Sequence, residues 1–319
     1  MNTGKRLAHW ATVVFVKLQL MLAYLPFWAL YAISDMLYFL IYHVARYRVK
    51  VVRDNIGKVF VDKTEKERKA IVKGFYRNFA DYFVETIKLH HVSDEQIRKR
   101  MVYEDTDIVD RLLDQGRSIV CYFAHCGNWE WAPSITLWTA HKPGAGVVYS
   151  QVYRPLNNKP MDALFLHLRA RFGSESFAKS HVLRDLIKVN RKGDLNVCGF
   201  MSDQKPSHGD PTHVMRFLGQ PTAMITGTET LARKLGMSAV YMDMYKLKRG
   251  RYKVKMRLVA ERPEDLPPME LTERYARMLE HTIMRNPSIW LWSHKRWKYP
   301  VVLKESEETC SEHGSKSAE

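Results

Sequence analysis

The chain has 319 residues, with 50 Lys or Arg against 34 Asp or Glu, and its formal net charge is +16. Hydrophobic residues make up 46% and charged residues 26% of the sequence, a balance that excludes a collagen-like, coiled-coil or wholly disordered chain. Such a length is typical of about two domains, or of one large domain with attached segments. The scattered cysteines, Cys121, Cys126, Cys198 and Cys310, favour neither a metal site nor a disulfide scaffold, and indicate a reducing compartment.

A long apolar segment lies near the N-terminus. Residues 18–34 carry no charge, and the apolar run resumes at residues 36–45. A spanning helix needs roughly 20 apolar residues, but Pro26 lies inside the run and favours a kink. We expect residues 1–50 to be a retained, helical membrane anchor rather than a signal peptide, either one tilted span or two interfacial helices. A helical hairpin buried in the globular part is the alternative.

Basic residues surround this segment and recur later in the chain. They are Lys5, Arg6, Arg46, Arg48, Lys50 and Arg53, and then Lys246, Lys248, Arg249, Arg251, Lys253 and Lys255. Each such residue near an anionic leaflet contributes on the order of 1 kcal/mol, so we expect an anionic membrane lipid as a partner, on the cytoplasmic side. A solvated charged face is the alternative. Nucleic acid is another usual partner of basic proteins. It is not expected here, because the apolar N-terminal segment makes an anionic lipid the simpler partner.

The rest of the chain alternates helix and strand patterns. Thr64 and Glu67 have capping-box spacing, and apolar residues then recur every fourth position to residue 87, which predicts an amphipathic helix. Further helices are expected at 106–115, 129–139, 160–172, 182–192, 226–235 and 271–285, and strands at 118–124, 145–149, 195–201, 239–245 and 252–258. This order predicts an α/β domain at 51–303, with a largely parallel central sheet, helices on both faces and an antiparallel pair at the turn 248–251. Residues 304–319, which net −3, are expected to be a disordered acidic tail.

The sequence HCGNWE follows the predicted strand 118–124, at the edge where parallel sheets bind ligands. On a continuous helix His125 and Glu130 would lie about 140° apart, so we expect Gly127 to turn the backbone and Asn128 to cap the next helix. Glu130 can then reach back to His125. An imidazole held by a carboxylate at one nitrogen is a general base at the other.

Two other interpretations of His125 stay open. An isolated His-x4-Glu spacing is common by chance, and the histidine can be an ordinary one at a strand end. Cys126 can be considered as a nucleophile paired with His125. Sequence neighbours seldom face each other at a strand end, however, so the pair with Glu130 is favoured.

Several further blocks stand in order along the chain. They are Arg53-Asp54-Asn55-Ile56, Tyr153-Arg154-Pro155-Leu156-Asn157-Asn158, Asp203-Gln204, Phe217-Leu218-Gly219-Gln220-Pro221 and Trp292-Ser293-His294-Lys295-Arg296-Trp297-Lys298. Together with the HCGNWE block and the apolar N-terminus, they resemble the bacterial lipid A biosynthesis acyltransferases of the lauroyl/myristoyl type, within the lysophospholipid acyltransferase superfamily. The resemblance covers residues from about 10 to 300.

The resemblance implies a membrane enzyme on the cytoplasmic face of the inner membrane. Such an enzyme moves a fatty acyl chain from acyl carrier protein, or coenzyme A, to a hydroxyl of a lipid A precursor or related glycolipid. Because the thioester is already activated, neither a metal nor a diffusible cofactor is expected. An enzyme of the same fold acting on a lysophospholipid or amino lipid is an alternative, as is a non-catalytic membrane or nucleic-acid binding protein.

The resemblance also implies roles for individual residues. His125 would be the general base and Glu130 its orienting partner. Arg154 would neutralise an oxyanion or a substrate phosphate, and Asp203 and Gln204 would border the cleft, with Asp203 as a simple loop cap the alternative. The set expected at the substrate is completed by Asn128 and Arg296. For Arg296, and for its neighbours Lys295 and Lys298, contact with the membrane surface is equally open.

Overall fold

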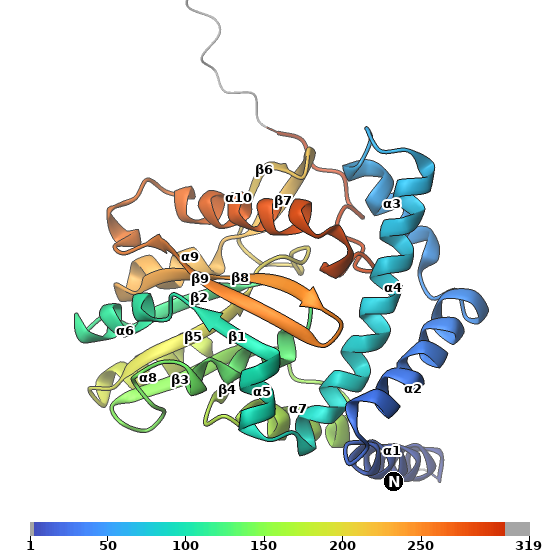
Figure 1. Cartoon of the computed structure of the whole chain (residues 1–319). Coiled ribbons are helices and arrows are strands. Elements are labelled where there is room, and N and C mark those ends of the chain that lie inside the picture. Colours follow the sequence, from blue (N-terminus) through green and yellow to red (C-terminus); the bar gives the residue numbers. More distant parts are fainter. Residues whose placement is uncertain (1–2, 304–319) are drawn as a thin grey trace, which may run out of the picture.

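The computed structural model describes residues 3–303, without the side chains of residues 3–9 and 11. A seven-stranded sheet in the order β1-β9-β8-β2-β5-β3-β4 forms its centre (Figure 1). The strands are β1 (Met101–Glu104), β2 (Ile119–Phe123), β3 (Val147–Tyr153), β4 (Glu175–Ala178), β5 (Leu195–Met201), β8 (Ser238–Lys248) and β9 (Arg251–Ala260). Five neighbouring pairs are parallel, and β8 and β9 are antiparallel across the expected turn. The expected α/β fold is confirmed, whereas the expected acidic tail lies outside the described residues.

Helices flank this sheet (Figure 1). They are α3 (Val49–Val59), α4 (Glu65–Lys88), α5 (Asp94–Arg100), α6 (Asp107–Asp114), α7 (Lys159–Ala170), α8 (Val182–Arg191), α9 (Gly227–Leu235) and α10 (Glu270–Arg285), with short 3₁₀ helices η2 (Leu89–His91), η3 (Trp129–Leu137), η4 (Pro263–Asp265) and η5 (Pro287–Ile289). The predicted capping box of α4 is confirmed, because Glu67 N–H donates to Thr64 Oγ1 over 3.3 Å and Thr64 N–H donates to Glu67 Oε2 over 2.8 Å. The predicted regular helix at 129–139 is wrong. Pro133 lies inside that segment and lacks a backbone donor, and the segment forms η3.

Four strands were not predicted. β1 and β4 are four-residue edge strands, too short to show a periodic pattern. β6 (Thr212–Phe217) and β7 (Gln220–Ile225) form a separate antiparallel hairpin. Its turn places Leu218 at φ +50° and Gly219 at φ +76°, and the Phe-Leu-Gly-Gln-Pro block is this turn.

The direction of the crossovers decides where a ligand can enter the sheet. Connections through α6, η3 and α7 move along the sheet toward β4, whereas those through α8 and α9 move back toward β8. Because parallel crossovers are right-handed, the two sets cover opposite faces. The chains leaving neighbouring strands β2 and β5 therefore go to opposite faces, and a crevice opens between the carboxyl ends of these strands.

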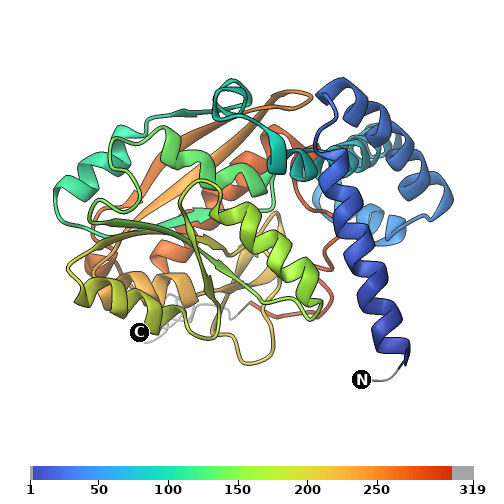
Figure 2. The same ribbon diagram turned by 90° about the horizontal axis from the view of Figure 1, so that it is seen from below.

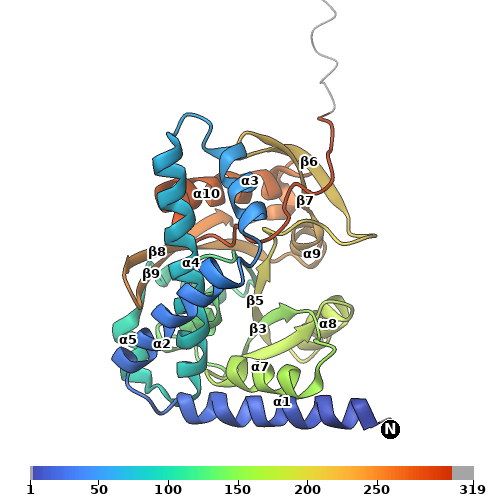
Figure 3. The ribbon, with the colours of Figure 1, turned by 90° about the vertical axis from the view of Figure 1, so that its right-hand side faces the viewer.

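The N-terminal segment forms two helices joined at Pro26. α1 (Thr3–Leu22) lies beside α7, where Asn158 Nδ2 donates to Thr12 Oγ1 over 3.2 Å (Figures 2 and 3). α2 (Phe27–Phe39) continues into the π-helix η1 (Leu40–Val44), and together they are long and apolar enough to cross a membrane. One side of α2 packs on α4 through Leu30 and Ser34.

The other side of the N-terminal helices is open. Only 11% of the apolar stretch Phe27–Val44 is buried, and Trp28 is 77% exposed. The exposed apolar side chains of the segment also include Val14, Phe15, Leu18, Leu20, Met21, Tyr24, Met36, Phe39, Leu40 and Val44. The alternative of a hairpin buried in the globular part is therefore wrong.

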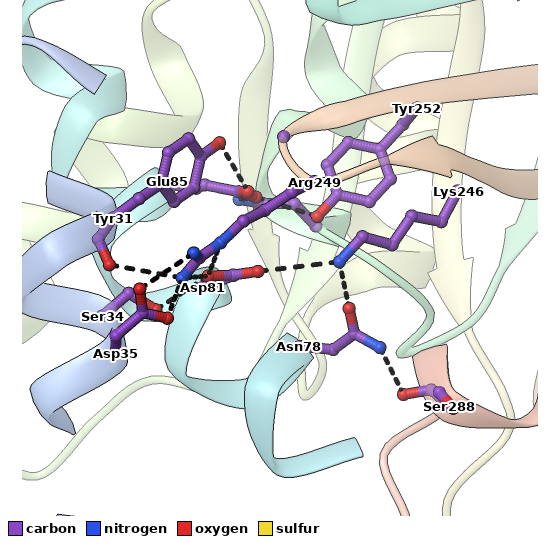
Figure 4. Close-up of polar contacts among 12 residues, drawn as sticks. Tyr31, Ser34, Asp35, Asn78, Asp81, Glu85, Lys246, Arg249, Tyr252 and Ser288 are labelled. Atoms are coloured by element: carbon purple, nitrogen blue, oxygen red, sulfur yellow. Dashed lines mark hydrogen bonds and ion pairs between the residues drawn. The ribbon is translucent and has the colours of Figure 1, made fainter. Parts of the chain in front are cut away.

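The basic cluster at residues 246–255 is largely paired inside the fold. Lys246 and Arg249 contact Asp81 of α4 at 3.6 and 2.7 Å (Figure 4). Lys253 and Lys255 are 3.2 Å from Glu104 and Asp105 respectively. The β8–β9 hairpin packs between α4 and β1, so acidic side chains there compensate these charges. Four of the six cationic side chains expected at an anionic membrane are thus ion-paired within the protein.

Candidate active site

The turn after β2 brings the site residues to the crevice between β2 and β5. Gly127 has φ +58°, as the predicted turn requires, and a Cβ there would lie 3.0 Å from the Tyr252 ring. Its N–H donates to Ile289 O over 2.9 Å, and Cys126 bridges to Trp290. Ile289, at the end of η5, and Trp290 thus hold the turn in place.

His125 contacts a carboxylate from the neighbouring strand. Its Nδ1 is 2.8 Å from Asp203 Oδ1, and its backbone N–H donates to Asp203 Oδ2 over 3.1 Å. Trp290 Nε1 donates to the same Oδ2 over 2.9 Å. Burial would raise the pKa of Asp203, which is 2% exposed, but the charge of His125 and these hydrogen bonds hold that pKa below its ordinary value. The carboxylate therefore orients the imidazole, and a simple loop cap is not what the structure shows.

The second ring nitrogen of His125 faces Gln204. With Nδ1–H donated to Asp203, Nε2 is an acceptor, and the Gln204 side-chain nitrogen lies 3.0 Å from it. The Trp129 ring packs edge-on against the imidazole, with ring centroids 5.1 Å apart. His125 also lines a pocket, as does Gln204.

Glu130 does not make the contact with His125 that the sequence predicted. Its carboxylate accepts two hydrogen bonds from Arg169 of α7, at 2.8 Å for Nη2 and 2.9 Å for Nε. Tyr82 of α4 also approaches, with its hydroxyl 3.4 Å from Oε1. A bidentate guanidinium on a nearly buried carboxylate is among the strongest side-chain pairs. Arg169 therefore determines the orientation of Glu130, and Asp203 takes the place at His125.

Asn128 also departs from its predicted role. Its side chain caps no helix; it is fully buried, and Nδ2 donates to Glu85 Oε2 of α4 over 3.0 Å. Asn128 is not among the residues that line the pocket. Its contact is with the scaffold behind the turn.

A pocket of about 770 Å³ opens in front of His125. Its apolar lining includes Phe123, Ala132, Pro133, Ile135, Val152, Phe165, Val197, Phe200, Leu231, Met242 and Leu291. Its polar lining includes Tyr82, His125, Glu130, Arg154, Arg169, Lys179, Gln204, Lys205 and Asp210. The pocket therefore suits a molecule with a long apolar part and an anionic or hydroxyl-bearing part.

Arg296 lies away from this pocket. It is 4% exposed, and its Nη2 donates to Ala223 O of β7 over 2.9 Å. Burial lowers the pKa of Arg296 to about 10. Contact with a headgroup or with a membrane surface is therefore wrong for Arg296, although Lys295 and Lys298 beside it are exposed.

Four residues at or behind the site were missed by sequence reasoning: Tyr82, Glu85, Arg169 and Trp290. Tyr82, Glu85 and Arg169 lie within helices whose apolar pattern gives no sign of a polar role. Trp290 stands two residues before the tryptophan-rich C-terminal block, which was the one signal near it. Asn55, in the Arg-Asp-Asn-Ile block, secures that C-terminal segment by donating to Trp292 O and His294 O at 2.9 and 2.8 Å.

Comparison with known proteins decides the family. Residues 3–299 match the model of the bacterial lipid A biosynthesis acyltransferases. The chain belongs to this family. It is 24% identical to the lipid A biosynthesis lauroyltransferase of Escherichia coli (strain K12) over 91% of this chain and 92% of the relative. It is 23% identical to the palmitoleoyltransferase of the same strain, with 79% of each chain covered.

A further relative is a lipid A biosynthesis acyltransferase of Haemophilus influenzae (strain ATCC 51907 / DSM 11121 / KW20 / Rd), which is 20% identical over 89% of this chain and 86% of the relative. This protein is thus an acyltransferase. Within residues 3–303 of the acyltransferase, no group of three or more His, Cys, Asp or Glu side chains is placed to hold a metal ion.

The partly buried His294 makes the stability of the acyltransferase sensitive to acid. Its Nε2 accepts the Lys205 N–H over 3.0 Å, and burial lowers the pKa of His294 from 6.5 to about 4. Between these pH values the unfolded chain binds a proton that the folded chain does not, so the free energy of unfolding falls as the pH falls from 6.5 to 4. We expect His294→Gln, whose amide oxygen can still accept that N–H, to show a smaller fall.

Urea unfolding followed by tryptophan fluorescence, at several pH values and constant ionic strength, measures this difference. Other titrating groups contribute equally to both proteins, so the comparison isolates His294. An identical pH dependence in the two proteins would contradict the prediction.

Proposed function

We propose that the protein transfers a fatty acyl chain from a thioester donor to a hydroxyl of a lipid A precursor or a related glycolipid. The observation that carries this proposal is the His125–Asp203 pair, at 2.8 Å, bordering a largely apolar pocket. A long apolar cavity suits an acyl chain, and a carboxylate-oriented imidazole suits the removal of a hydroxyl proton. Family membership supports the same reaction class.

In the proposed mechanism His125 is the general base. Its Nε2 takes the proton of the acceptor hydroxyl as the oxygen attacks the thioester carbon, and Asp203 stabilises the resulting imidazolium. The tetrahedral intermediate collapses by breaking the carbon–sulfur bond. The imidazolium then returns its proton to the departing sulfur, so that an ester and a thiol are formed and His125 is restored. Glu130 takes part through Arg169, whose guanidinium it holds at the pocket.

The acceptor is proposed to bind at the cationic mouth of the pocket. Arg154 is exposed there, and Lys205 and Arg169 line the same wall. Lys179 is also present, although it pairs with Asp210 at 2.7 Å. Guanidinium and ammonium groups suit a phosphorylated glycolipid, or the oxyanion that develops in the reaction. Together with Gln204 beside Nε2, these groups would orient the acceptor hydroxyl.

The N-terminal helices are proposed to bind the membrane, with the catalytic domain on the cytoplasmic face of the inner membrane. Their exposed apolar side chains, which include aromatic ones, form a hydrophobic surface whose exposure to water is unfavourable. The nearby Arg46, Lys50 and Arg53 are exposed and suit anionic lipid headgroups. In this arrangement a lipid acceptor reaches the enzyme without leaving the membrane.

Acyl carrier protein is proposed as the donor, in preference to coenzyme A. A second hollow lies along α8 and is lined by Ser180, His181, Leu183, Arg184, Ile187, Lys188, Arg191 and Lys192. Lys179 and Val182 of the same segment line the main pocket, so the two hollows adjoin. Arg184, Lys188, Arg191 and Lys192 are exposed and form no ion pair with any residue of 3–303. This basic surface suits an acidic carrier protein.

The roles of His125 and Asp203 are tested by acyl transfer in vitro, with acyl carrier protein thioesters and a lipid A precursor in mixed micelles. We expect His125→Ala and Asp203→Asn each to lower kcat by about 10²–10⁴-fold, because the base or its orienting carboxylate is lost. Asp210→Asn is the matched control, since Asp210 lines the pocket without contacting His125. A wild-type rate for Asp203→Asn, or an equal loss for Asp210→Asn, would count against the mechanism.

The acceptor is tested by mass spectrometry of total lipids from cells with and without the protein. Loss of one acyl chain from lipid A is expected when the protein is absent. A change confined to lysophospholipids or amino lipids would instead identify the acceptor of the alternative acyltransferase. Unchanged lipids, together with no transfer in vitro, would leave only a binding role.

The donor surface is tested by reversing charge on α8. We expect the double variant Arg184→Glu/Lys188→Glu to raise KM for acyl carrier protein thioesters by about tenfold or more, since like charges then face the acidic carrier. The KM for a short pantetheine thioester should stay unchanged. Lys66→Glu/Lys73→Glu, on an exposed face of α4, is the matched control. Equal effects of the two double variants on KM would refute the docking surface.

A further inference from the structure

A buried carboxylate connects the N-terminal helices to the turn that carries His125. Glu85 of α4 is fully buried. Its side chain accepts hydrogen bonds from Tyr31 of α2 at 3.1 Å and from Tyr252 of β9 at 2.9 Å (Figure 4). It also accepts one from Asn128 of the turn at 3.0 Å. Three separate parts of the chain therefore meet on one side chain.

A second carboxylate strengthens this junction one helical turn earlier. Asp81 accepts from Ser34 of α2 at 2.7 Å and from Arg249 Nε at 2.9 Å. Arg249 also binds Asp35 of α2 at 2.7 Å (Figure 4). The polar side of α2 is thus tied to α4 at two levels, while its other side is the exposed apolar surface described above.

On the catalytic side, residue 85 contacts Asn128, at the end of the turn, and Trp131 of the following helix η3. Asn128 lies three residues after His125, and its hydrogen bond to Glu85 is the only one its side chain makes within residues 3–303. Trp131 Nε1 donates to the backbone oxygen of Glu85 over 3.2 Å. A displacement at position 85 would therefore reach His125 through a short buried path.

We propose that Glu85 is a positioning residue that holds the His125 turn through Asn128 and links this turn to α2 through Tyr31. This inference rests on the proposed role of His125, although Glu85 itself contacts neither pocket nor substrate. All three neighbours donate hydrogen bonds, so an acceptor oxygen is what the position requires. Burial raises the pKa of Glu85 to about 7, and the hydrogen bond from Asn128 opposes that rise.

The requirement for an acceptor distinguishes two substitutions. Glu85→Gln keeps an oxygen for Asn128 and Tyr252, and its amide can face the Tyr31 hydroxyl, which is able to accept. Glu85→Met has a similar volume but leaves the two buried donors, Asn128 and Tyr252, and the partly buried Tyr31 without an acceptor. Val84→Ala is the matched control, because it removes buried apolar contact one residue away without touching the turn.

The experiment compares kcat and KM of these full-length variants in the acyl-transfer assay, at a temperature where thermal melts show each to be folded. A displacement of about 1 Å in a reacting group can cost about 10²-fold in rate, and we expect that loss in kcat for Glu85→Met, with KM unchanged. Glu85→Gln should restore kcat to about the wild-type value, and Val84→Ala should lower the melting temperature without lowering kcat. A wild-type kcat for folded Glu85→Met, or an equal loss in Val84→Ala, would overturn the proposal.

Asn128→Ala provides a second approach if Glu85→Met does not fold. It removes the donor on the turn and leaves Tyr31 and Tyr252 on Glu85, so it should lower kcat to a similar extent. A wild-type kcat in folded Asn128→Ala would overturn the proposal.

The NMR signal of the His125 imidazole gives a readout that needs no substrate. We expect it to move in Glu85→Met and to return in Glu85→Gln. If the wild-type protein transfers no acyl chain while this signal behaves as expected, the proposed function fails and the positioning role stands. A signal that does not respond to Glu85→Met would overturn the positioning role itself.

Discussion

The contact between His125 and Asp203 is the constraint on which the site depends. His125 follows β2 and Asp203 follows β5, and because these strands are parallel neighbours, the imidazole and the carboxylate meet at 2.8 Å beyond the same edge of the sheet. Trp290 Nε1 and the His125 N–H bind the remaining oxygen of Asp203, so the carboxylate is fully engaged where water is excluded. Removing one partner of such an arrangement costs far more than forming it gains.

Two further buried carboxylates support this pair from behind. Glu130 holds Arg169 at the pocket wall, and Glu85 holds Asn128 beneath the turn. Each lies among donors from other elements, because a charged group in the interior is tolerated only when it is paired or well hydrogen-bonded. Glu130, in the HCGNWE block, and Glu85, in α4, thus contact neighbouring residues of the scaffold and not the His125 imidazole.

The molecule has two separate apolar regions. The pocket in front of His125 is lined by core residues of β2, β3 and β5, so a cavity for a long chain arises inside the same hydrophobic core that stabilises the sheet. The N-terminal helices instead leave their apolar side chains outside. One apolar region thus lines the pocket and the other is exposed on the N-terminal helices, where α2 is joined to α4 by polar contacts.

The sequence alone determined what depends on local pattern. The buried strand before His125, the turn at Gly127, the capping box at Thr64 and the alternation of helix and strand were all predictable, because periodicity and backbone preference act over a few residues. The carboxylate that contacts the imidazole was not predictable, since Glu130 is near His125 in sequence but Asp203 is near it in space. Only the tertiary structure decided that pairing, the burial of Arg296 and the contacts of Glu85, because each depends on strand order and on contacts between distant segments.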